Sequence, residues 1–183
     1  MAYEADRRVR LHAFADEAKE RGYIMVAALL APKNLAPARQ SIKGLIMPGQ
    51  RRLHFQKESN GRRKQILDAV AALGVEAIVY DGHRYASNKP ARDACLARLV
   101  TDLTKLDVER LILETEDGAL KSDKALIFAQ LRSTGDGNAL RYAHMRAYEE
   151  SLLAIPDAIA WSWAKGGHWR ARISEIVSDV RKV

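Results

Sequence analysis

Four acidic residues stand where the surrounding sequence favours apolar residues or the start of a helix. Asp16 and Glu17 follow an alternating apolar stretch. Glu114 directly follows three apolar residues, and Asp157 opens an apolar segment near the C-terminus. Carboxylates are preferred ligands of Mg²⁺ and Mn²⁺, and two such ions about 3.5–4 Å apart can activate water and stabilise the leaving oxygen of a phosphodiester. If the fold gathers these acids, the chemistry they indicate is metal-dependent phosphodiester hydrolysis.

Each of these acids also has a purely structural interpretation. Asp16 and Glu17 would fit a polar hairpin turn, and Glu114 would fit an acidic, solvated turn. Asp157 would fit the first turn of a helix, where the helix dipole favours an acid. Asp81 ends a further apolar run and is an alternative member of the site.

The acids must be positioned by strands and helices whose periods are visible in the sequence. Residues 7–18 alternate as far as Phe14 and then break at the two acids, which predicts a strand that ends in a polar turn. Residues 22–31 are apolar and follow a short connection, so the two segments indicate an antiparallel hairpin. A helix over 35–47 and a short strand over 51–56 are expected next.

A helix followed by a strand then occurs twice, over 60–81 and over 91–117. Such units add strands to a sheet through right-handed parallel crossovers. A helix over 119–132, an extended segment over 138–150, a helix from Pro156 and a basic helix over 169–183 complete the prediction. The fold class is therefore α/β, with a mixed sheet that begins antiparallel and finishes parallel and carries helices on its faces.

Composition limits the class of protein. The 183 residues are 48% hydrophobic and show no linker, which indicates one domain over 1–183. The longest apolar run, residues 24–31, is too short to span a membrane, and the N-terminus is charged rather than signal-like. A single cysteine, Cys95, excludes an internal disulfide and suits a reducing cytoplasm.

The formal charge of +7 favours a polyanionic partner. Basic residues cluster around 51–52, 61–64 and 168–172, where they either form solvated helix faces or follow phosphates. Trp169 could stack on bases if it is exposed, whereas Trp161 and Trp163 belong to an apolar helix and are expected in the core. The candidate nucleic-acid-binding residues are Arg51, Arg52, Arg62, Arg63, Lys64, Trp169, Arg170 and Arg172.

Several of these segments together resemble a known family. The stretches "HAFADEA…YIMVAALL", "RRLHF", "RLILETEDGALKSDKAL" and "LLAIPDAIAWSWAKGG" are similar to the motifs of the bacterial and phage family called domain of unknown function 3800. The resemblance spans about residues 11–165 and implies an RNase H-like fold.

The resemblance also implies roles for individual acids. Asp16 and Glu17 match the acidic pair of the first strand, and Asp157 matches the acid of the terminal helix. Glu114 matches the acid after a later strand, with Asp123 as a further ligand. The sequence departs from the family pattern where Ala18 and Lys19 replace Ser and Gly and where Pro156 replaces Ala.

The leading hypothesis is a nuclease that uses Mg²⁺ or Mn²⁺ and acts on DNA or RNA. Its expected catalytic residues are Asp16, Glu17, Glu114 and Asp157, and its expected metal ligands are Asp16, Glu114, Asp157 and Asp123. The missing Ser and Gly motivate an alternative, a non-catalytic nucleic-acid-binding or protein-interaction module on the same fold. A structural protein of a mobile element is a third alternative, and the oligomeric state stays open.

Overall fold

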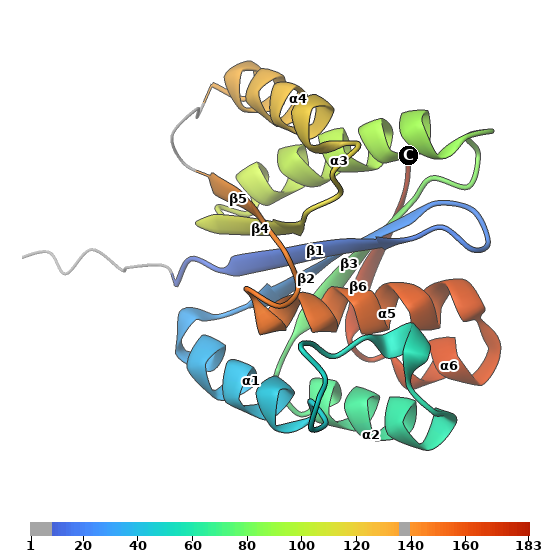
Figure 1. Cartoon of the computed structure of the whole chain (residues 1–183). Coiled ribbons are helices and arrows are strands. Elements are labelled where there is room, and N and C mark those ends of the chain that lie inside the picture. Colours follow the sequence, from blue (N-terminus) through green and yellow to red (C-terminus); the bar gives the residue numbers. More distant parts are fainter. Residues whose placement is uncertain (1–8, 136–139) are drawn as a thin grey trace, which may run out of the picture.

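The computed structural model describes residues 9–135 and 140–183 and is built around one mixed sheet of six strands. The strands lie in the order β5-β4-β1-β2-β3-β6 (Figure 1). β2 runs antiparallel to both β1 and β3, whereas β4 is parallel to β1, β5 to β4 and β6 to β3. The strands are β1 (His12–Ala18), β2 (Ile24–Leu30), β3 (Glu76–Asp81), β4 (Arg110–Glu114), β5 (Arg141–Met145) and β6 (Val177–Lys182). The mixed α/β sheet expected from the sequence is confirmed.

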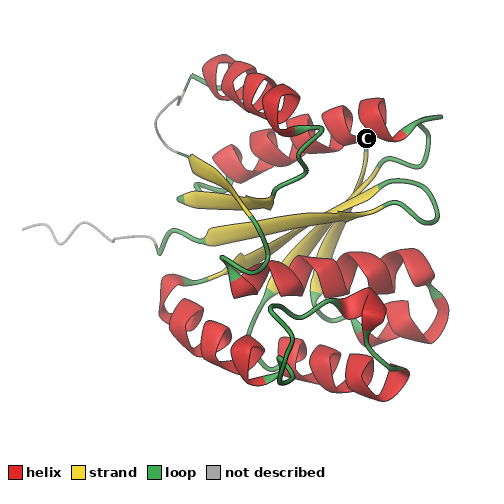
Figure 2. Cartoon of the chain, in the orientation of Figure 1, coloured by secondary structure: helices red, strands yellow, loops and turns green. Residues whose placement is uncertain are grey.

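Helices cover both faces of this sheet (Figures 1 and 2). α3 and α4 lie on one face, and α5 crosses the other face with α1, α2 and α6 on the same side. The helices are α1 (Pro32–Gly44), α2 (Asn60–Ala71), α3 (Asn88–Lys105), α4 (Leu120–Ser133), α5 (Ala154–Lys165) and α6 (Gly167–Arg172), with short 3₁₀ helices η1 (Phe55–Lys57) and η2 (Ser151–Leu153). The result is a layer of strands between two layers of helices.

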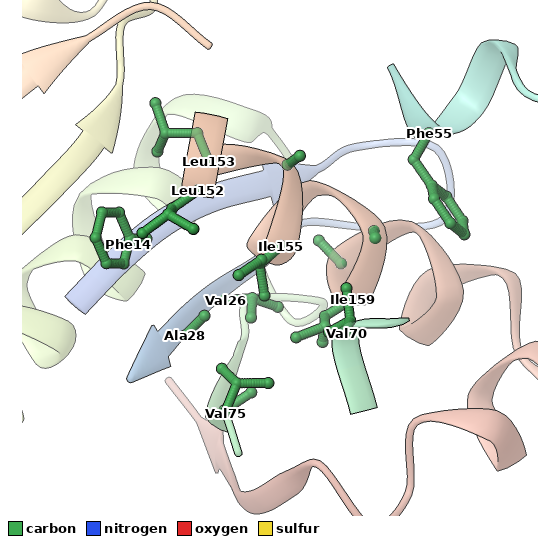
Figure 3. Packing of buried hydrophobic residues seen from close by; sticks show 14 of the residues in the cluster. Phe14, Val26, Ala28, Phe55, Val70, Val75, Leu152, Leu153, Ile155 and Ile159 are labelled. Carbon is green, nitrogen blue, oxygen red and sulfur yellow. The ribbon is translucent and has the colours of Figure 1, made fainter. Parts of the chain in front are cut away.

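The alternation of side chains along β1 divides the buried apolar residues into two cores. Phe14 belongs to the core on the α5 face, and Ala13 and Ala15 belong to the core on the α3–α4 face. On the α5 face, Ile155 and Ile159 of α5 are fully buried in the same core as the strand residues (Figure 3). Each such burial contributes about 1.5–3 kcal/mol, so α5 is fixed against the strand that carries Asp16 and Glu17.

The first strand is longer than the sequence predicts. Asp16 pairs with Val26 and Glu17 with Met25, so the β1–β2 ladder runs through both acids instead of ending at Phe14. The expected polar turn at the acids is therefore wrong. The acids lie within a strand because the apolar partner strand β2 continues the backbone pairing beside them.

Two further segments differ from their predictions. Residues 51–54 form no strand but a loop into η1, whose Phe55 is fully buried and packs edge-on against Trp161 with ring centroids 5.4 Å apart. The basic helix expected over 169–183 ends as α6 at Arg172, and β6 then pairs with β3. Pairing with an available sheet edge outweighs local propensity here. The parts of the expected elements at 7–8 and 138–139 lie outside the described residues.

No helix within 9–135 and 140–183 combines the length and apolar character that crossing a bilayer requires.

Candidate functional site

Two of the predicted acids lie side by side near the carboxyl ends of neighbouring parallel strands. Ala15 of β1 is level with Leu113 of β4, and the next residues are Asp16 and Glu114. Alternation places both on the α5 face of the sheet, since Phe14 and Ile112, two positions earlier, pack in the α5-face core. The Glu114 side chain is close enough to Asp16 to raise the pKa of the Asp16 carboxyl group.

The third acid, Asp157, approaches these two from the first turn of α5. Its Oδ2 accepts a hydrogen bond from the backbone N–H of Phe55 at 3.2 Å, so η1 fixes its orientation. Asp16 and Asp157 border the same pocket of about 290 Å³, together with Trp161 and residues of the β1–β2 hairpin. Asp16, Glu114 and Asp157 are called the acid trio below.

The electrostatics of the acid trio show that its carboxylates crowd one another. Burial raises the pKa of Asp16 well above its usual range, and the charges of Asp157 and Glu114 raise it further. Burial also raises the pKa of Asp157 to about 6, because the hydrogen bond from Phe55 and the charge of Arg52 only partly offset burial and the charge of Glu114. A proton or a cation at this place relieves the repulsion between the carboxylates.

The trio offers only carboxylate oxygens, the donors that hard divalent cations prefer, and two of its members, Asp16 and Asp157, border an open pocket. In the described part of the chain, no group of three or more His, Cys, Asp or Glu side chains is placed so that it could hold a metal ion without rearrangement of the side chains. All three carboxylates have other partners: Glu114 Oε1 lies 3.5 Å from Arg52 Nη1, Asp157 accepts from the backbone of Phe55, and Asp16 accepts from the backbone of Glu17. Coordination by all three would require Glu114 to turn from Arg52 toward the ion.

Glu17, predicted to be catalytic, directs its side chain to a different group of residues. Its Oε1 lies 2.7 Å from Arg92 Nη1 and 3.2 Å from Lys19 Nζ. Burial raises the pKa of Glu17, with Arg92 acting against this shift and a hydrogen bond to Glu116 adding to it. Its backbone N–H donates to Asp16 Oδ1 at 2.8 Å. Glu17 therefore supports the trio through its backbone, while its carboxylate is held by two cations.

Asp123, expected as a further metal ligand, lies on the opposite face of the sheet. Its side chain is fully buried and forms a two-pronged pair with Arg92, at 3.0 Å to Nε and 2.8 Å to Nη2. His144 Nε2 lies 3.2 Å from its Oδ2. Burial raises the pKa of Asp123, but the hydrogen bonds from His144 and Arg92 outweigh this effect and lower it to about 2. The prediction that Asp123 joins the trio is wrong, because α4 packs against α3 rather than α5.

The candidate nucleic-acid-binding residues divide into held and available side chains. Arg62 binds Glu58 and a backbone carbonyl, and Arg172 pairs with Asp68 at 2.7 Å. Arg170 donates twice to the Trp163 carbonyl and lies over its ring. These three cations are therefore engaged in holding the fold.

The remaining candidates differ in exposure. Trp169 is only 5% exposed, so the proposal that it stacks on bases is wrong. Arg51 lies over the ring of Tyr148 and Arg52 reaches Glu114. Lys64 is exposed on α2. Arg63 borders a second pocket that adjoins the first.

This second pocket contains four residues that were not predicted as part of a site: Glu20, Gln56, Asn60 and Lys165. Glu20, Gln56 and Trp161 line both pockets, and the second pocket also includes Arg63 and Lys165. The spacing of Asp157, Trp161 and Lys165, four residues apart on one helix, was the available signal. Buried Arg92 gave no signal, since an arginine in an amphipathic helix is normally solvated.

Asp81, the alternative acid at the end of β3, is held locally. Its Oδ1 accepts from the backbone N–H of His83 at 2.9 Å and lies 2.5 Å from His83 Nδ1. It lines neither of the two pockets described above.

Comparison with known structures identifies the fold. The chain is similar to an RNase HII chain in the structure of the PCNA:RNase HII complex from Archaeoglobus fulgidus, with a TM-score of 0.57 and 18% identity. The match covers 90% of this chain and 77% of that chain. Comparison with protein-family models and with curated proteins gives no match. The fold is RNase H-like, as the sequence resemblance implies.

Proposed function

We propose that this chain is a metal-dependent hydrolase of phosphodiester bonds in nucleic acid, with Asp16, Glu114 and Asp157 as the ligands of Mg²⁺ or Mn²⁺. The observation that carries the proposal is the meeting of three acids, from β1, β4 and α5, on one face of the sheet, where Asp16 and Asp157 border an open pocket. The RNase H-like fold and the net charge of +7 support it.

The cost of keeping these acids together supports a functional role. A fold selected for stability alone gains nothing from burying Asp16 and Asp157 beside other carboxylates that raise their pKa. A bound divalent cation would neutralise the repulsion between these carboxylates. The trio offers only the hard oxygen donors that Mg²⁺ and Mn²⁺ prefer.

The residues around the trio have roles that follow from their contacts. The backbone N–H groups of Glu17 and Phe55 orient Asp16 and Asp157, as outer partners of metal ligands commonly do. A bound divalent ion would supply Lewis acidity and a water of lowered pKa. Arg52, once Glu114 turns away from it, has a guanidinium suited to a phosphate oxygen of the substrate.

One observation favours a second candidate function. Arg52 already supplies a positive charge to Glu114 at 3.5 Å, so the site has a counter-charge of its own. A non-catalytic nucleic-acid-binding module would keep this arrangement. The two candidates differ in whether the trio binds a metal ion and whether strands are cut.

The decisive experiment measures metal binding and cleavage with the same proteins. Mn²⁺ is titrated into wild type and into the Asp16→Asn and Asp157→Asn variants by calorimetry. Labelled single-stranded and duplex DNA and RNA are then incubated with Mg²⁺, Mn²⁺ or a chelator. Glu76→Gln is the matched control, because Glu76 is an exposed acid at the start of β3, the end of the sheet away from the trio.

Wild type and Glu76→Gln should bind Mn²⁺ and cut at least one substrate. The two Asp variants should lose binding and at least about 100-fold of the rate, since removal of a single charge-stabilising group typically costs that much. Nucleic-acid binding without Mn²⁺ binding or cleavage in wild type would replace the proposal with the non-catalytic module.

We also propose that the chain belongs to the domain of unknown function 3800 family and acts in the cytoplasm. The RNase H-like fold and the positions of Asp16, Glu114 and Asp157 at its core support the family. Cys95 is a free, buried thiol, which suits a reducing compartment.

A further inference from the structure

The groove beside the acid trio has the composition of a phosphate-binding surface. It is lined by Glu20, Gln56, Asn60, Arg63, Trp161, Lys165 and Trp169. It shares Glu20, Gln56 and Trp161 with the pocket that Asp16 and Asp157 border. Asp16, Asp157 and the groove cations therefore line one continuous depression.

Helix α5 sets the direction of this depression. Asp157, Trp161 and Lys165 are four residues apart, so they follow one another along one stripe of the helix. At a rise of 1.5 Å per residue, Lys165 lies about 12 Å along the helix from Asp157. The carboxylate of Asp157, the ring of Trp161 and the ammonium group of Lys165 therefore follow one another in this order along α5.

Hydrogen bonds hold Arg63 in a fixed orientation and leave some of its N–H donors available. Its Nε donates to the Phe55 carbonyl at 3.1 Å, and its terminal nitrogens donate to Asn60 Oδ1 at 2.8 Å and the Gln56 carbonyl at 2.5 Å. Its guanidinium also lies 4.4 Å from the centre of the Trp161 ring. A guanidinium has five N–H donors, so two remain available to a phosphate.

Lys165 is the most available cation of the groove. It is exposed, and its Nζ lies 5.7 Å from the centre of the Trp161 ring. Within the described residues, its Nζ has no hydrogen bond or ion pair, and the Trp161 ring is its contact. Glu20, the acid on the groove wall, accepts a hydrogen bond from Gln56, and its charge opposes anion binding.

The tryptophans do not offer their faces to bases. The ring of Trp161 lies beneath Arg63 and Lys165, and that of Trp163 lies beneath Arg170 at 4.4 Å. Trp169 is buried. Base stacking is the usual way in which aromatic residues bind single strands, so this groove is built for the backbone and not for bases.

We infer that Lys165 and Arg63 form a backbone subsite that holds the phosphates of one nucleic-acid strand, without regard to base sequence, on one side of the bond that is cut. The inference rests on the proposed function for its reference point, the acid trio. The span of about 12 Å corresponds to about three or four nucleotides at a helical rise of about 3.4 Å per nucleotide. Substrates therefore need that many nucleotides on one side of the cleavage point for full activity.

The test compares Lys165→Gln with Lys124→Gln, which removes an exposed lysine of α4 on the opposite face of the sheet. Binding of labelled oligo(dT), oligo(dA) and duplex is measured by fluorescence anisotropy over a range of salt concentrations, in chelator to prevent cleavage. Lys165→Gln should weaken binding to all three ligands and lower the slope of log K against log salt by about 0.7 for single strands and about 0.9 for duplex. Lys124→Gln should match wild type.

Cleavage adds an independent readout. Substrates are shortened by one nucleotide at a time on each side of the cut. Wild type should lose kcat/KM when the phosphate nearest Lys165 is removed, and Lys165→Gln should show no further loss at that step, because the contact is already absent.

The outcomes separate the two proposals. If Lys165→Gln binds with wild-type affinity and salt slope while wild type cleaves, the subsite is refuted and the proposed function stands. If Lys165→Gln lowers affinity and slope but wild type never cleaves, the backbone subsite stands and hydrolysis is refuted. A preference of more than about tenfold between oligo(dT) and oligo(dA), equal to about 1.4 kcal/mol, would refute readout through the backbone alone.

Discussion

Replacing Asp157 with Asn should stabilise the metal-free protein at neutral and alkaline pH while abolishing metal binding. Asp157 has its pKa raised from 3.8 to about 6, chiefly by burial, with the charge of Glu114 adding to the shift. An asparagine keeps an oxygen that can accept the hydrogen bond from Phe55 but carries no charge. The substitution therefore removes the unfavourable ionisation and retains the local contact.

The size of the effect follows from the shift. Because the folded-state pKa lies above the unfolded value, the folded protein binds more protons between about pH 4 and pH 6 than the unfolded chain does. Its stability must then fall as the pH rises through that window. A shift of about two pH units corresponds to about 3 kcal/mol, which is fully lost above the folded pKa. Asp16, whose pKa is also raised by burial and by the neighbouring acids, adds a loss in the same direction.

Urea unfolding in chelator at pH 4, 5, 6 and 8 measures this effect. Wild type should lose stability across the series, and Asp157→Asn should lose about 3 kcal/mol less and be the more stable protein at pH 8. Glu76→Gln should follow wild type. An Asp157→Asn protein that is no more stable than wild type at pH 8 would refute the reasoning that the trio is held together against its own repulsion.

Two further outcomes are expected. Mn²⁺ at about 100 times its Kd should stabilise wild type by about 2.7 kcal/mol and leave the stability of Asp16→Asn unchanged. Thermal unfolding measures both effects, and equal stabilisation of the two proteins would show that the metal binds elsewhere. Arg92→Met should cost about 3–5 kcal/mol, because it leaves the fully buried Asp123 carboxylate without its arginine partner. Lys89→Met breaks an exposed pair with Asp93 on the same helix and should cost at most about 1 kcal/mol. Urea unfolding distinguishes these costs, and similar losses in both variants would contradict the role given to the buried network.

The acids of the trio could be predicted from the sequence more accurately than the length of β1, the strand that carries Asp16. The rule that parallel strands present their carboxyl ends at one edge is independent of strand order, so Asp16 and Glu114 could be matched before the sheet was known. Because the first strand was predicted to end at Phe14, the direction of the Glu17 side chain could not be predicted. In a strand that continues, neighbouring residues face opposite sides, and Glu17 then belongs with Arg92 instead of with Asp16.

Other features depend on tertiary contacts that no local pattern contains. The orientation of Asp123 is decided by the packing of α4 on α3. Val177 and Val180 are three residues apart, which is a helical spacing, yet β6 forms because β3 offers an unpaired edge. The burial of Trp169 follows from its edge-on contact with Trp161, with ring centroids 5.4 Å apart.

The two faces of β1 are linked through a single peptide unit. On one face, Arg92 and Lys19 hold the Glu17 carboxylate; on the other, the backbone N–H of Glu17 donates to Asp16 Oδ1 at 2.8 Å. The buried ion network thereby fixes the backbone that orients the first ligand of the trio. Arg92 does not contact the acid trio, yet it helps to fix the orientation of Asp16 and also stabilises the fold. This arrangement explains how an arginine can be buried among four carboxyl and hydroxyl partners, those of Glu17, Glu116, Asp123 and Tyr23, on the face of the sheet opposite the acid trio.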